Sequence, residues 1–144
     1  MTSIISRKPF YSSITIIIFL PLAVFFVWGV LLILFGMKIL EENNIDSIVH
    51  GVGGVSTCLS TAGVLWHLVR REIITLQDEN VFRFLVFGFL CFVVIVWEIL
   101  EYIVFYPFEY LTYTDTLLDM ICGLIGGLFA MLFFRKPTFG KNFS

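Results

Sequence analysis

Apolar residues fill four long segments of this chain, and polar residues are concentrated in the short stretches between them. No residue between Lys8 and Lys38 is charged. A helix rises about 1.5 Å per residue, so roughly 20 apolar residues cross a bilayer core about 30 Å thick. The pattern predicts spanning helices at about 14–37, 47–69, 82–106 and 116–134. We therefore expect an all-α fold, a polytopic bundle of four transmembrane helices, with residues 1–144 as a single transmembrane domain.

The composition agrees with this pattern and excludes a soluble globular protein. Of the 144 residues, 59% are hydrophobic and only 14% are charged, which is more apolar surface than a soluble domain of this length could bury. The connections between the four segments are too short to hold a separate soluble domain. The sequence therefore predicts a multi-pass protein of the cell membrane.

Basic residues are distributed unequally over the segment flanks, which predicts the orientation. One side of the predicted membrane has eight: Arg7, Lys8, Arg70, Arg71, Arg83, Arg135, Lys136 and Lys141. The other side has only Lys38. Because Lys and Arg accumulate in cytoplasmic flanks, we expect both termini in the cytoplasm. These residues are accounted for by topology, so no nucleic-acid partner is expected.

Acidic residues and one histidine interrupt the apolar segments at a similar predicted depth. Counted from the basic residue at each helix's cytoplasmic end, Glu98 and Asp119 lie roughly 22–24 Å up, and His50, Glu101 and Asp115 roughly 27–30 Å up. Glu98 and Glu101 are spaced i,i+3 and the two aspartates i,i+4, so each pair shares a helix face. The sequence predicts a polar site between the second, third and fourth helices, near the extracytoplasmic face.

Four carboxylates in one place require neutralisation. Two unit charges 4 Å apart repel by about 4 kcal/mol at an effective dielectric constant near 20. Protons could neutralise them, but a divalent cation fits best, with His50 as a neutral ligand. The predicted metal ligands are His50, Glu98, Glu101 and Asp119, and the candidate catalytic residues are Asp115 and Glu101. The identity of the metal is not predicted.

The same residues could also have purely structural roles. Glu98 and Glu101 could form a solvated helix end. Asp115 could be present only because a negative charge is favourable near the N-terminus of a helix. His50 could bond a backbone group or a glutamate without any metal.

Three blocks in order, DSIVHGVGG, WEILEY and DTLLDMICGLIGG, give the sequence a family resemblance. It resembles the YjdF-type bacterial and archaeal membrane proteins over about residues 46–130. It is more distantly similar to the VanZ-like family, from whose pattern NIDSIVH and MICGLIGG depart. The resemblance implies a small helical membrane fold with polar residues gathered between helices. The residues that the resemblance implies for this polar group are Asp46, His50, Glu98, Glu101, Asp115 and Asp119.

Two functions are compatible with these residues. The first is metal-dependent hydrolysis or modification of a lipid or lipid-linked substrate. The second is a cation- or proton-binding transport or regulatory module without catalysis. The sequence does not decide whether the protein is an enzyme, because it contains no evident nucleophile and no arginine clamp for phosphate. Membrane lipids are the expected partners, and an oligomer or a partner protein is left open.

Overall fold

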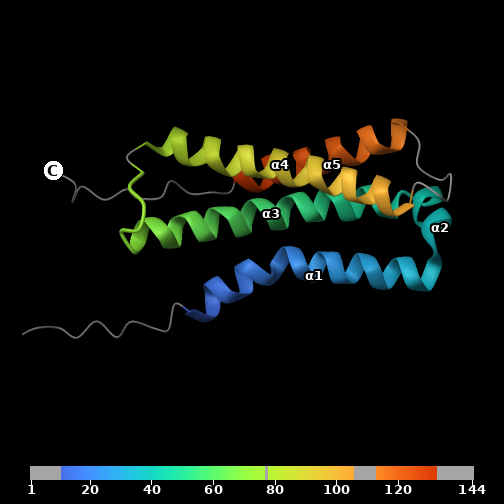
Figure 1. Cartoon of the computed structure of the whole chain (residues 1–144), viewed down its shortest axis with the longest axis horizontal. Helices are drawn as coiled ribbons and strands as arrows, with labels where there is room; N and C mark the ends of the chain where they lie inside the picture. The colour runs from blue at the N-terminus through green and yellow to red at the C-terminus, as the bar shows by residue number, and fades with distance from the viewer. Residues whose placement is uncertain (1–10, 77, 106–112, 133–144) are drawn as a thin grey trace, which may run out of the picture.

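The structure is a computed structural model that describes residues 11–76, 78–105 and 113–132. Every regular element in these ranges is a helix: α1 (Tyr11–Phe35), α2 (Met37–Glu42), α3 (Ile45–Arg70), α4 (Glu79–Phe105) and α5 (Tyr113–Leu132). The long helices lie side by side, with α1 and α4 running one way and α3 and α5 the other (Figure 1). Four of them are long and apolar enough to cross a membrane, which confirms the predicted fold class.

Two residues with left-handed backbone geometry separate α1, α2 and α3. Gly36 has φ +73°, a conformation that glycine adopts without steric cost, and it ends α1 one residue before α2 begins. Asn44 has φ 54° and precedes the first residue of α3. The first connection therefore holds a short helix that the hydrophobic pattern did not predict, and α3 starts at Ile45.

Helix α3 is the centre of the assembly. It packs against α1, α4 and α5, and its closest neighbour is α5. A Cβ atom at Gly54 would overlap the carbonyl of Gly123, and one at Gly126 would overlap the carbonyl of Gly51. The absence of side chains at these positions lets the two backbones approach closely. Gly53 differs from its neighbour Gly54, because a Cβ at Gly53 would meet nothing within 4 Å.

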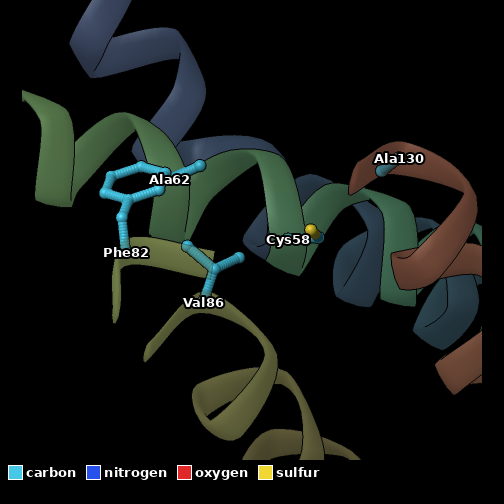
Figure 2. Close-up of a cluster of buried hydrophobic side chains, with 5 residues drawn as sticks. All are labelled: Cys58, Ala62, Phe82, Val86 and Ala130. Atoms are coloured by element: carbon cyan, nitrogen blue, oxygen red, sulfur yellow. The ribbon is translucent and has the colours of Figure 1, made fainter. Parts of the chain in front are cut away.

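A small apolar core holds α3, α4 and α5 together in the half of the bundle away from α2. It consists of Cys58, Ala62, Phe82, Val86 and Ala130 (Figure 2). Phe82 and Val86 on α4 point toward α3. Toward α2, the same three helices bury Asp46, His50, Glu98, Glu101 and Asp119.

The predicted orientation is not tested by these features. Of the basic residues on which it depends, Arg7, Lys8, Arg135, Lys136 and Lys141 lie outside the described residues. The cytoplasmic location of both termini stays a prediction.

Candidate functional site

His50 lies at the centre of a buried polar cluster at the α2 end of the bundle. Its Nε2 atom is 3.4 Å from Oε2 of Glu101 on α4 and 3.8 Å from Oδ2 of Asp46, one turn earlier on α3. All three side chains are buried, with 8%, 5% and 2% of their residue surface exposed for His50, Glu101 and Asp46. The Nε2 edge of the imidazole therefore faces two carboxylates, one from α3 and one from α4.

Glu98 lies on the opposite edge of the same imidazole. Its Oε1 atom is 3.4 Å from Nδ1 of His50, and its side chain is buried as well. Because Glu98 and Glu101 are one helical turn apart on α4, they flank the ring from one helix. The two ring nitrogens thus face different acids.

Helix α1 contributes to this cluster through Trp28. The indole Nε1–H donates a 2.8 Å hydrogen bond to Oδ1 of Asp46. The Trp28 ring also meets Trp97 of α4 edge-on, and Trp97 in turn lies edge-on to His50 with ring centroids 6.1 Å apart. Asp46 and His50 are therefore held between aromatic rings of α1 and α4.

The two aspartates of α5 lie near the start of that helix. The Ser47 hydroxyl donates a 2.7 Å hydrogen bond to Oδ1 of Asp119, which is buried. Asp115 is in the first turn of α5 and is partly exposed. This hydrogen bond connects Asp119 on α5 to Ser47, which follows Asp46 on α3.

Several buried polar atoms of the cluster lack a hydrogen-bond partner among the described residues. They are Asp46 Oδ2, His50 Nε2, Glu98 Oε1 and Glu101 Oε1. A buried polar group without a hydrogen bond costs about 1–3 kcal/mol, and a buried unpaired charge costs more. Lys38 does not relieve this, because it is exposed and pairs with Glu42 at 3.8 Å. The cluster therefore has capacity for a further ligand.

The donor set fits a divalent metal ion. One atom from each of Asp46, His50 and Glu101 can be chosen so that all three lie within 4.8 Å of one another, and all three residues are buried. Mixed imidazole and carboxylate ligands suit Zn, Mn and Fe. Glu98, on the other ring nitrogen, has the position of an acid that orients a metal-binding histidine.

An apolar cavity of about 250 Å³ adjoins the cluster. His50, Trp28 and Trp97 form its end beside the acids, and Val24, Phe25 and Val94 are among its other lining residues. His50 thus borders both the acids and an apolar space inside the membrane-spanning region.

A family model matches most of the chain. The model described as "Predicted membrane protein (DUF2238)" matches residues 3–137. The chain belongs to this family. The resemblance to YjdF-type membrane proteins is thereby confirmed, and with four spanning helices the protein is a multi-pass membrane protein. The family match shows no link to the VanZ-like family. Comparison with the curated proteins and with the solved structures gave no match.

The structure brings some of the predicted site residues into contact with His50 and places the others differently. Glu98 and Glu101 each lie 3.4 Å from a ring nitrogen of His50. Asp119 is buried and bonded to Ser47, while Asp115 occupies the first helical turn that its alternative interpretation required. The solvated-end interpretation of Glu98 and Glu101 is wrong, because both are buried.

Sequence reasoning missed Trp28 and Ser47 and did not place Asp46 among the metal ligands. Asp46 could have been found, because it lies four residues before His50 and so shares its helix face. Trp28 lies within an uninterrupted apolar run and gives no such signal. Its role depends on how α1 packs against α3.

Proposed function

We propose that this protein is an integral membrane enzyme that uses a divalent metal ion to hydrolyse or otherwise modify a lipid or lipid-linked substrate. The observation that carries the proposal is the buried group of Asp46, His50 and Glu101, whose ligand atoms fit within 4.8 Å. Buried acids of this kind inside membrane-spanning helices are costly and are usually functional.

Each residue of the cluster has a separate role in this proposal. Asp46, His50 and Glu101 hold the ion, which when bound would supply a Lewis acid and an activated water. Glu98 fixes the orientation of the His50 ring from Nδ1, and Trp28 fixes the Asp46 carboxylate. Asp115, partly exposed beside the cluster, is the candidate base that accepts a proton from water.

The surroundings of the cluster favour a lipid substrate over a soluble one. The acids are on apolar helices, and the adjoining cavity is lined mostly by apolar and aromatic side chains. A hydrophobic molecule could reach this position from the bilayer. A polar soluble substrate would find few hydrogen-bonding partners along the same path.

Metal analysis of the purified protein tests the proposal. We expect divalent metal to copurify with the wild type, to be removed by a chelator, and to be retained poorly by Asp46→Asn and Glu101→Gln. Glu42→Gln is the matched control, since Glu42 is an exposed acid that pairs with Lys38. A wild type that neither contains nor rebinds any divalent ion would contradict the proposal.

The competing function is a cation- or proton-binding module without catalysis. It is supported by the same buried carboxylates, since a protonated carboxyl group could donate to an unpartnered neighbour. In that case Glu101→Gln relieves repulsion and stabilises the protein to the same extent with metal and with chelator. Under the metal proposal, the variant instead loses the stabilisation that added metal gives to the wild type.

A further inference from the structure

The apolar cavity is elongated along the helix axes and begins at the polar cluster. On α3 its lining extends from Val49 to Thr57, and on α1 from Trp28 back to Pro21. These stretches cover eight and seven helical steps, or about 12 and 10 Å, in the same direction away from the acids. The cavity therefore leads from the acids toward the middle of the membrane-spanning region.

The backbones of α1 and α4 do not pack against each other, and side chains lie between them. Among the described residues, no α1–α4 pair has Cα atoms within 8 Å, whereas α1 packs directly on α3. Side chains bridge the two helices, with Phe25 and Trp97 edge-on at 4.7 Å between ring centroids. Leu22 and Phe25, which line the cavity, are 59% and 50% exposed. A membrane lipid beside α1 is thus next to the cavity without a backbone barrier.

The chemistry and size of the cavity restrict its occupant. Water is a poor occupant, because a buried water needs two to four polar partners and an apolar cavity of about 150 Å³ stays dry. A volume of about 250 Å³ is below the range of about 300–1,000 Å³ for drug-sized ligands, so there is no room for both chains of a phospholipid. One hydrocarbon chain satisfies both restrictions.

We propose that this cavity binds one acyl chain of a membrane phospholipid, which enters between α1 and α4 and brings the polar end of the lipid to Asp46, His50 and Glu101. The second chain stays in the bilayer. The identification of this lipid as a substrate rests on the proposed function, but binding of its chain does not require the metal.

Photo-crosslinking in vesicles tests the chain site. The purified protein is reconstituted in phosphatidylcholine containing a trace of phosphatidylcholine with a diazirine in the middle of one acyl chain, and labelled residues are located by mass spectrometry after irradiation. We expect labelling of Thr57 and Val94, which line the cavity and are each only 8% exposed. Ile33, at 84% exposure, reports labelling by the surrounding bilayer.

Glycine variants supply the matched comparison. A Cβ at Gly53 meets nothing within 4 Å and Gly53 lines the cavity, so Gly53→Leu should fill it without a backbone clash. Gly88→Leu makes the same change on α4, also with open space at the Cβ, away from the cavity lining. We expect Gly53→Leu to reduce labelling of Thr57 and Val94 at least about tenfold, and Gly88→Leu to leave it unchanged. Val24→Phe, which fills the cavity from the lipid-exposed helix α1, is the second blocking variant.

The outcomes separate this proposal from the metal proposal. Labelling of Ile33 without Thr57 or Val94 in the wild type, or labelling unchanged in both blocking variants, overturns the chain site. Crosslinking of the same residues by a diazirine fatty acid but not by the phospholipid also overturns it, because the occupant is then a free acid. Metal content is measured on the same samples, and a metal-free protein that still labels Thr57 contradicts only the proposed function.

Discussion

His50 and Glu101 face each other across α3 and α4, with Nε2 of the histidine 3.4 Å from Oε2 of the glutamate. Asp46 shares that side of the ring, whereas Glu98 lies 3.4 Å from Nδ1 on the other side. One imidazole therefore divides the acids into a pair that can bind a metal ion and a partner that can orient the ring.

Glu98→Gln should weaken metal binding without abolishing it. The amide keeps the shape of the side chain but removes the charge beside His50 Nδ1, and loss of such an outer partner typically costs 10–100-fold in metal affinity. Titration of the metal-free protein with Mn²⁺ or Zn²⁺, followed by thermal unfolding in detergent, measures this. An affinity loss as complete as that of Glu101→Gln would instead make Glu98 a direct ligand, as the sequence alone predicted.

Added metal should stabilise the wild type but not Asp46→Asn. A ligand at 100 times its dissociation constant contributes about 2.7 kcal/mol to the free energy of unfolding, provided that the unfolded chain does not bind it. The melting temperature with chelator and with metal reports the difference. Glu79→Gln, at an exposed ion pair with Arg83 on α4, should keep the full metal response.

Trp28→Phe should destabilise the protein even without metal. The substitution keeps an aromatic ring but leaves Oδ1 of the buried Asp46 without its 2.8 Å hydrogen bond, at a cost of about 1–3 kcal/mol. Thermal unfolding with chelator present measures it. Trp66→Phe is the comparison, because a phenyl ring can still lie beneath the Arg70 guanidinium, and a loss as large there would argue against a specific role for the Trp28 bond.

Gly54→Ala and Gly53→Ala should have opposite effects on stability. A methyl group at Gly54 overlaps the Gly123 carbonyl of α5, and overpacking of this kind costs about 1–3 kcal/mol. At Gly53 the methyl group has open space, and the higher helix propensity of alanine favours folding by up to about 1 kcal/mol. Unfolding of the two variants in the same detergent gives the comparison. Equal effects would contradict the close α3–α5 packing.

The orientation can be tested with single cysteines in a background without Cys58, Cys91 and Cys122. A cysteine at Asn43, in the connection before α3, should react with a membrane-impermeant maleimide added outside the cell. One at Thr75, between α3 and α4, should react only after the membrane is opened. The reverse pattern would place the polar cluster near the cytoplasmic face.

The sequence by itself determined the class of the protein and the helices that carry the site. Lipid solvation is a local requirement, because each spanning segment must be apolar along its own length, so the hydrophobic pattern was sufficient. The spacings of Glu98 with Glu101 and of Asp115 with Asp119 are likewise local properties of a helix. Rise per residue then put His50 and the two glutamates in one slab near the extracytoplasmic face. In the structure both glutamates lie 3.4 Å from the His50 ring.

Tertiary structure decided which atoms meet within that level. Sequence periodicity gives the face of a residue but not the rotation of one helix against another, so it could not show that Asp46 joins His50 and Glu101 while Asp119 bonds to Ser47. Trp28 and the cavity depend on the packing of α1 on α3 and its separation from α4. An apolar run is compatible with any rotation of α1 in lipid, and only side-chain contacts between helices select one.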